Sequence, residues 1–213
     1  MRLAAAPLLL LLASPLPAGA DPYFPLRVGN WWTYEELDDD GHALARETWT
    51  VEARDRGEFH LRSRSKRLDG LGTGDIQWEG HEYFRQAADG LHKRYPKGRE
   101  AALDVVLLKS PTRSGTRWRD GQGTCEVLSN GVACLGPHGE HPDCLTIICR
   151  LGDPTATIVT STYARDVGMV QQEVRVMQLT PSFAGPDLVL PGDPSSGGRS
   201  LLRLIGYRLV DGN

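Results

Sequence analysis

Residues 31–65 read WWTYEELDDDGHALARETWTVEARDRGEFHLRSRS and contain two turn signals between alternating side chains. The first is Asp40-Gly41, a pair typical of a two-residue hairpin turn in which both residues take positive φ. A turn at this place predicts a register for the two flanking strands. In that register Leu37 faces Leu44, Glu35 faces Arg46, Thr33 faces Thr48 and Trp32 faces Trp49. Such charge and aromatic pairs stabilise antiparallel strands.

The second signal is Asp55-Arg56-Gly57, which predicts a three-residue loop with Gly57 in the left-handed conformation. The loop would place Ala53 opposite Phe59, Val51 opposite Leu61 and Trp49 opposite Ser63. Because side chains alternate along a strand, both turns select the same buried face. We expect that face to contain Trp32, Tyr34, Trp49, Val51, Ala53, Phe59 and Leu61, with Trp32, Tyr34, Trp49 and Phe59 as its aromatic core. The opposite, solvated face would contain Glu35, Arg46, Glu52, His60, Arg62 and Arg64.

The remaining sequence repeats this pattern of short apolar segments between Gly, Pro and Asp clusters. Such spacing is typical of an all-β protein, and no long segment follows a helical period. We therefore predict a single-domain curved antiparallel sheet, or a partly open barrel or sandwich, built from consecutive hairpins over residues 21–213. The further strands are expected at 76–87, 104–109, 116–119, 144–151, 157–163, 168–179 and 201–210. Residues 181–200 hold many Pro and Gly residues and are expected to form a loop.

Residues 1–20 read MRLAAAPLLLLLASPLPAGA and are typical of a signal peptide. Arg2 supplies the positive start, and Ala18-Gly19-Ala20 is a small-residue cleavage site. The prolines interrupt the apolar run well before the roughly 20 residues that a membrane span needs. We expect an exported chain, periplasmic or secreted, that does not span the membrane.

The 24 basic and 27 acidic residues leave a formal net charge of −3. A dedicated nucleic-acid-binding protein usually has a large basic excess, so this function is not expected. Two basic clusters remain, Arg62, Arg64, Lys66 and Arg67, and then Lys93, Arg94, Lys97 and Arg99. Both are interpreted as solvated faces, although either type of cluster can contact an anionic lipid or polysaccharide.

The four cysteines, Cys125, Cys134, Cys144 and Cys149, lie close together in the sequence. An even number in an exported chain favours disulfides. We favour the pairs Cys125–Cys134, around a turn at 129–131, and Cys144–Cys149. An odd separation of five places Cys144 and Cys149 on opposite faces of a straight strand. Crossed pairs such as Cys125–Cys149 or Cys134–Cys144 therefore stay open.

The alternative for this region is a metal site made by His138, His141 and Cys144, because zinc accepts mixed nitrogen and sulfur ligands. The paired C-x-x-C spacing of a strong zinc motif is missing, so no metal and no cofactor are expected. His81-Glu82 begins like a zincin motif but lacks its second histidine, and strand alternation explains it. No catalytic residue is predicted, and the chain is not expected to be an enzyme.

The segment Tyr23–Tyr34, YFPLRVGNWWTY, resembles the opening of a family of uncharacterised exported bacterial β-rich proteins, which carry an FPL-x-x-GN-x-W-x-Y segment there. Residues 136–145 and 163–170 are similar to two further segments of that family, the second of the form A-x-x-VG-x-V. Asp166 stands where the family usually has Gly, and the 136–143 turn lacks the family's Phe. The resemblance implies a β-rich exported protein and gives no catalytic residue.

Together these observations predict a non-catalytic envelope protein that acts as a binding or scaffold module. A curved sheet with an aromatic inner face would hold a lipid or another apolar or amphipathic ligand in its concavity. One alternative is a protein–protein assembly factor of the envelope that uses the 181–200 loop or a sheet edge. A second alternative is an unrecognised hydrolase or metal-binding protein.

Overall fold

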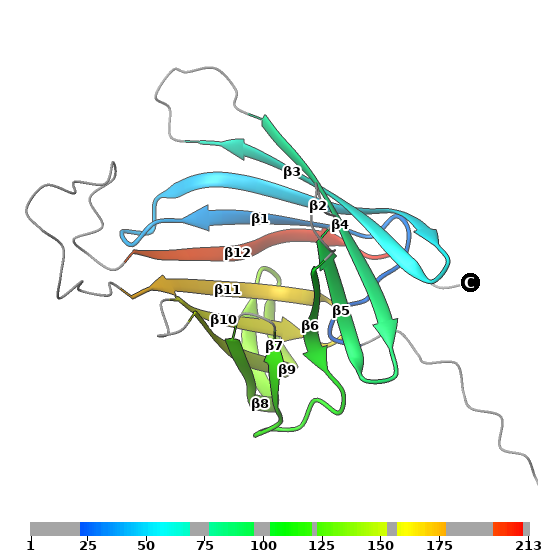
Figure 1. The fold of residues 1–213 in the computed structure, drawn as a ribbon. Helices are drawn as coiled ribbons and strands as arrows, with labels where there is room; N and C mark the ends of the chain where they lie inside the picture. The colour runs from blue at the N-terminus through cyan, green and yellow to red at the C-terminus, as the bar shows by residue number, and fades with distance from the viewer. Residues whose placement is uncertain are drawn as a thin grey trace, which may run out of the picture.

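The computed structural model describes residues 22–68, 77–95, 103–120, 123–152, 157–177 and 198–210. These residues form one antiparallel sheet with the strand order β6-β5-β4-β3-β2-β1-β12-β11-β10-β9-β8-β7 (Figure 1). The predicted all-β fold is confirmed. The strands are β1 (Trp31–Leu37), β2 (Ala43–Asp55), β3 (Glu58–Arg67), β4 (Gln77–Ala87), β5 (Gly90–Tyr95), β6 (Leu103–Lys109), β7 (Arg117–Asp120), β8 (Gly123–Gly136), β9 (Gly139–Leu151), β10 (Thr157–Ala164), β11 (Gly168–Val176) and β12 (Arg199–Arg208).

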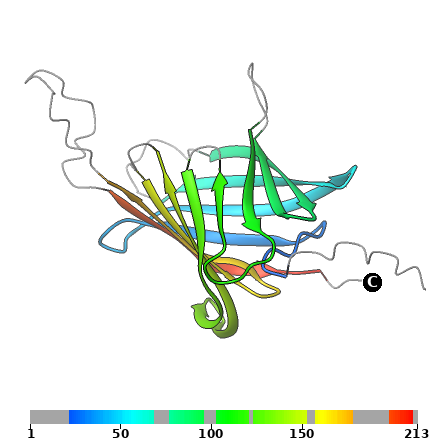
Figure 2. The same ribbon diagram turned by 60° about the horizontal axis from the view of Figure 1, so that its bottom comes forward.

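The sheet curves until its two edge strands, β6 and β7, stand side by side (Figure 2). The ring nitrogen of Trp118 on β7 donates a hydrogen bond to the Val106 carbonyl on β6 at 2.9 Å. The first and last strands, β1 and β12, pair in the middle of the sheet. We call β1–β6 the first half-sheet and β7–β12 the second half-sheet. Their inner faces enclose the core.

The β1–β2 hairpin follows the predicted register over most of its length. The pairs Glu35–Arg46, Thr33–Thr48 and Trp32–Trp49 are confirmed. The pair Leu37–Leu44 is wrong, because the register shifts after Glu36 and Leu37 faces Ala43. Gly41 has a φ of 83° while Asp40 is not among the residues with positive φ, so the connection is not the predicted two-residue turn. The Gly41 N–H donates to the Asp38 carbonyl at 3.1 Å and closes a longer loop.

In the β2–β3 hairpin the predicted loop is too long, whereas in the β1–β2 hairpin it is too short. Arg56 and Gly57 have φ values of 47° and 86°, and Asp55 faces Glu58, so the connection is a two-residue turn. The pairs Val51–Leu61 and Trp49–Ser63 are confirmed, but a register shift between Val51 and Ala53 places Phe59 opposite Arg54. Ala53 is consequently exposed, and its prediction as a buried residue is wrong. One extra residue in one strand is the usual form of such a β-bulge.

Two further elements differ from expectation. Strand β5 was not predicted, because its Gly90–Tyr95 sequence is mostly polar and basic. Residues 129–131 were expected to form a turn, but β8 runs through them from Gly123 to Gly136 with register irregularities on both sides of Asn130. The actual turn joins Gly136 to Gly139. The signal-peptide prediction at 1–20 and most of the predicted 181–200 loop lie outside the described residues.

The segment before β1 contributes to the core. Tyr23, Phe24 and Leu26 are at most 2% exposed. The Phe24 ring stacks on Trp32 and Phe84, with centroids 5.5 Å and 5.4 Å away, and meets the edge of Tyr163 at 6.3 Å. Phe24 therefore packs between the two half-sheets, and residues 22–30, drawn in dark blue in Figure 1, fill part of the concavity.

Candidate functional site

Charged side chains share the inner face of the first half-sheet with its apolar core. Val51, Phe84 and Leu91 are at most 1% exposed and point inward. Alternation along β2, β4 and β5 places Glu47, Glu82 and Lys93 on the same face. The inner face is therefore apolar next to residues 22–26 and polar farther along the strands.

Lys93 and Glu82 form an ion pair inside the sheet. The Lys93 Nζ atom lies 2.7 Å from Glu82 Oε1, and the two side chains are only 14% and 19% exposed. Burial alone would lower the pKa of Lys93, but the Glu82 carboxylate and the Tyr95 hydroxyl raise it above its ordinary value. Lys93 consequently keeps its positive charge in a partly dehydrated setting.

Lys93 was assigned to a solvated basic cluster with Arg94, and this interpretation is wrong. Lys93 points inward, whereas Arg94 is on the outer face and pairs with Glu58. Residues on a strand alternate, so neighbouring basic side chains serve different faces. Lys97 and Arg99 lie outside the described residues.

Glu47 lies directly across from Tyr34 in the β1–β2 pair. Within the described ranges, no Lys, Arg or His side chain lies within ion-pair distance of Glu47. Burial raises the pKa of its carboxyl. Trp49 and Lys93 oppose that shift, while the Glu82 and Glu36 carboxylates add to it.

The Tyr34 hydroxyl is fully buried and has no hydrogen-bond partner in the part of the chain that the structure describes. Burial raises the pKa of Tyr34 well above its ordinary value, and the nearby Tyr163, Glu47 and Glu82 contribute. A buried polar atom without a partner costs about 1–3 kcal/mol. Four more inner atoms share this condition: Trp49 Nε1, Ser63 Oγ, Glu82 Oε2 and Gln86 Nε2. Atoms of this kind often mark a bound water, ion or ligand.

The second half-sheet has a different inner face. Among the residues of this half-sheet that the structure describes, Ser161 is the buried polar residue, and its hydroxyl accepts a hydrogen bond from the Gln172 amide at 3.0 Å. Its other buried side chains are apolar or aromatic, among them Trp118, Val127, Leu145, Ile147, Tyr163, Met169, Val170 and Leu204. This wall can line an apolar group.

Both disulfides lie in the β8–β9 hairpin of the second half-sheet. They join Cys125 to Cys149 and Cys134 to Cys144, so the favoured pairs Cys125–Cys134 and Cys144–Cys149 are wrong. The physical reason is that β8 and β9 are antiparallel. Cys125 is directly opposite Cys149, and Cys134 lies near Cys144 across the irregular part of the hairpin.

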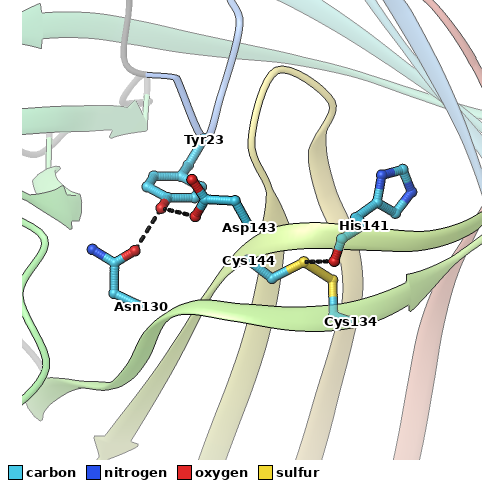
Figure 3. The surroundings of a disulfide bond; sticks show 6 residues. All are labelled: Tyr23, Asn130, Cys134, His141, Asp143 and Cys144. Carbon is cyan, nitrogen blue, oxygen red and sulfur yellow. Dashed lines mark hydrogen bonds between the residues drawn. A yellow bond between two sulfur atoms is a disulfide. The ribbon is translucent and has the colours of Figure 1, made fainter.

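The alternative metal site at His138, His141 and Cys144 loses its thiolate, because Cys144 is bonded to Cys134 (Figure 3). The His138 ring packs against the edge of Tyr207 at 5.2 Å. His141 and Cys144 are neighbours through the backbone, since the Cys144 sulfur lies 3.6 Å from the His141 carbonyl. The region is a cross-linked hairpin.

The same hairpin holds residues 22–26 in place (Figure 3). The Tyr23 hydroxyl lies 2.7 Å from Asp143 Oδ1 and 2.5 Å from Asn130 Oδ1. Arg165 pairs with the same Asp143 carboxylate and lies over the Tyr23 ring. Burial and the Asp143 carboxylate raise the pKa of Tyr23 to about 12, so its hydroxyl is protonated at neutral pH.

The outer face also has a hollow. An open pocket of about 350 Å³ is lined by Arg46, Thr48, Arg64, Ser65, Lys66 and Leu68. Arg46 lies 3.4 Å from Glu35, and Arg64 lies 3.0 Å from Glu79. These exposed ion pairs neutralise much of the basic cluster and are typical of a solvated face.

The inner polar cluster was missed, although the sequence contained its signal. Glu47 is two residues before Trp49, Glu82 is two before Phe84, and Lys93 is two after Leu91. Each therefore shares a face with a residue that a strand pattern would bury. Trp32, Tyr34 and Phe59 are buried, and Trp49 packs against Tyr34 with ring centroids 4.9 Å apart.

No family model matches the sequence, and no curated protein matches it. Among the described residues, no helix is long and apolar enough to cross a bilayer. Two solved structures are similar in fold. One is a Bacteroides fragilis protein whose name calls it exported and gives it a YmcC-like fold. It has 12% identity and a TM-score of 0.50, with 87% of this chain and 98% of that one covered. The other is a Parabacteroides distasonis protein named as a lipoprotein, with 12% identity, a TM-score of 0.45, and 89% and 100% covered. The first likeness shows that this chain shares the YmcC-like fold.

Proposed function

We propose that this protein is an exported, non-catalytic binding module that holds an amphipathic ligand in the concavity of its sheet. The observation that carries the proposal is the set of buried inner atoms without partners, above all the Tyr34 hydroxyl. A filled scaffold core would pair or exclude such groups. A ligand with one polar group and one apolar part matches the two inner faces.

The arrangement of the core supports this division. The apolar inner face of the second half-sheet offers Val127, Ile147 and Leu204 to an apolar chain. The first half-sheet offers Tyr34, Glu47 and Glu82 to a polar group. Residues 22–26 close part of the concavity, so the ligand would lie beyond them, on the side of the polar cluster.

Export is part of the proposal. It is supported by the sequence of residues 1–20, which is typical of a signal peptide, and by the pairing of all four cysteines. The resemblance of residues 23–34, 136–145 and 163–170 to a family of exported β-rich proteins agrees with it. Both the periplasm and the exterior would provide the oxidising conditions.

Binding can be tested with the fluorescent apolar probe N-phenyl-1-naphthylamine and the purified chain that lacks residues 1–20. We expect saturable binding that Ala45→Phe weakens by at least about tenfold, because Ala45 is on the inner face and is 7% exposed. Thr48→Phe, on the outer face of the same strand, should leave binding unchanged. Equal binding by both variants, or no binding by the parent chain, would overturn the proposal.

A second candidate function is assembly with another envelope protein, and the β8–β9 hairpin favours it. Leu128, Val132 and Leu135 are 48%, 56% and 80% exposed there. An open pocket of about 480 Å³ separates Leu135 from Val170 and Leu204. Photo-crosslinking from position 135 in intact cells, with position 28 as the exposed control, would yield one dominant protein adduct if this function holds.

A further inference from the structure

We propose that the inner cluster of Tyr34, Glu47 and Glu82 binds the positively charged ammonium group of the amphipathic ligand. This inference rests on the proposed function and deepens it, because it assigns the chemical class of the ligand's polar group. The argument comes from charge balance, from atoms without partners and from the neighbouring aromatic rings.

The charges on the inner face do not balance. Alternation along β1, β2 and β4 directs the carboxylates of Glu36, Glu47 and Glu82 inward. Two inward cations face these three carboxylates in the described ranges. Lys93 has its ammonium group committed to Glu82 Oε1 at 2.7 Å, and Arg67 lies opposite Ala45 at the exposed end of β3. Removing a carboxylate from water without a positive partner is costly. An added cation would lower that cost.

The geometry offers several acceptors around one place. Glu82 Oε2 remains without a partner because Lys93 takes only the other oxygen. The Tyr34 hydroxyl is also without a partner, and Tyr34 lies directly opposite Glu47 in the β1–β2 pair. An ammonium group donates up to three hydrogen bonds, which Glu82 Oε2, the Tyr34 hydroxyl and the Glu47 carboxylate can accept.

Aromatic rings border the same place. The Tyr34 and Trp49 rings lie 4.9 Å apart on neighbouring strands. Cations are attracted to the faces of such rings, and dehydration strengthens the attraction. Lys93 already uses this effect, since its Nζ atom lies 4.8 Å from the centre of the Tyr95 ring.

Other polar groups fit less well. An anionic group would meet the unbalanced carboxylates and raise the electrostatic free energy. A neutral hydroxyl could pair with Tyr34 but would leave Glu47 without a cation. An ammonium group satisfies both conditions.

The test compares three amphiphiles with the same ten-carbon chain below their micelle concentrations: decylammonium, decanoate and decyl maltoside. Calorimetry at pH 7 on the chain without residues 1–20 should show decylammonium binding at least about tenfold more tightly than the other two. Glu47→Gln should remove most of that preference, because a close charge pair in a partly buried site is commonly worth tenfold or more. Glu52→Gln changes the charge of the same strand at its exposed, Arg62-paired position and should leave the preference intact.

The outcomes separate the two proposals. Equal binding of all three amphiphiles would overturn the ammonium inference and leave the proposed binding function standing. Binding of none would overturn both. A preference for decylammonium that survives Glu47→Gln would also overturn the inference, provided that circular dichroism shows the variant folded. The substitution keeps the side-chain shape, so a loss of preference in a folded variant reports the charge.

Discussion

The two half-sheets have similar strand numbers and face the same core, but they are stabilised differently. The second half-sheet holds both disulfides, in the β8–β9 hairpin, and its inner polar hydroxyl at Ser161 is paired. The first half-sheet has no cysteine, and its inner face carries Glu47, Glu82 and Lys93. One wall is cross-linked and apolar, and the other is polar without a cross-link.

Under the proposed function, this difference gives the second half-sheet a stabilising role and the first half-sheet a binding role. Buried groups without partners reduce stability, and a fold retains them where they serve a ligand or a specific contact. The cross-linked wall and residues 22–26 supply stability that offsets this cost. We therefore expect substitutions in the second half-sheet and in the 22–26 segment to change stability strongly. Substitutions in the inner cluster should change binding and pH dependence.

The largest effect on stability is expected for Phe24→Ala. The Phe24 ring contacts Trp32 and Phe84 on one half-sheet and Tyr163 on the other, so its loss leaves a cavity between them. Truncation of a buried Phe costs about 3–5 kcal/mol. Urea denaturation followed by tryptophan fluorescence measures the change. Val28→Ala, at a position 49% exposed, is the control and should change the free energy of unfolding by less than about 0.5 kcal/mol. A loss below about 1 kcal/mol for Phe24→Ala would mean that the half-sheets do not depend on this ring.

Replacing Cys125 and Cys149 together by Ala is expected to cost about 3 kcal/mol, because the bond closes a long loop in the unfolded chain. The Cys134–Cys144 bond closes a shorter loop, with a sequence separation of 10 against 24. Its double replacement should cost less, by under about 1 kcal/mol. Denaturation of both double variants measures the difference. If neither double replacement lowers stability, the second half-sheet does not owe its stability to the cross-links.

The fold class could be predicted because turn residues and alternation are local signals. Gly41 and Gly57 correctly indicate the two hairpins, but the predicted loop lengths are exchanged. The first connection is the longer loop, and the second is the two-residue turn. The bulges near Glu36 and Ala53 shift the register by one residue at each turn, and sequence patterns near a turn do not reveal such an insertion. The central pairs Trp32–Trp49 and Val51–Leu61 were independent of that detail.

Predicting the disulfide pairs required the position at which the chain reverses between β8 and β9. An uninterrupted β8 runs past 129–131, where a turn was expected, and only then does the chain reverse. The opposite-face argument against Cys144–Cys149 was sound, because Cys149 faces Cys125 across the inner face. Residues 23–26 were likewise identified only as part of a family motif. The local sequence pattern does not indicate that their aromatic rings pack inside the curved sheet. The turn residue Asp166, at a position where the resembling family usually has Gly, takes a φ of 58°, a conformation that Asp tolerates better than most residues.

An intermediate effect is expected for Lys93→Met, which leaves the Glu82 carboxylate inside the sheet without its cation. Breaking one partner of such a pair costs about 2 kcal/mol or more. Adding Glu82→Gln to this variant should recover most of the loss, because the orphaned charge is then gone. Thermal unfolding of both variants measures this. Failure of the second substitution to restore stability would contradict the assignment of this loss to the unpaired Glu82 charge.

The smallest effect on stability is expected for Glu47→Gln. This substitution should stabilise the protein, whereas the substitutions above destabilise it. Burial raises the pKa of Glu47 in the folded protein above its unfolded value, so the native state loses stability as the pH rises through that raised pKa. At pH 7 the ligand-free Gln variant should therefore melt about 1–3 °C above the parent protein. Below the unfolded pKa both forms are neutral at this position, and the difference should vanish. Glu52→Gln should show no such gain, because Glu52 is paired with Arg62 near the surface. Melting curves of the parent protein and both variants from pH 3 to 8 measure this difference in melting temperature. A Gln variant less stable than the parent at pH 7 would mean that the Glu47 charge is already compensated, and the polar wall would then carry no unbalanced charge for an ammonium ligand.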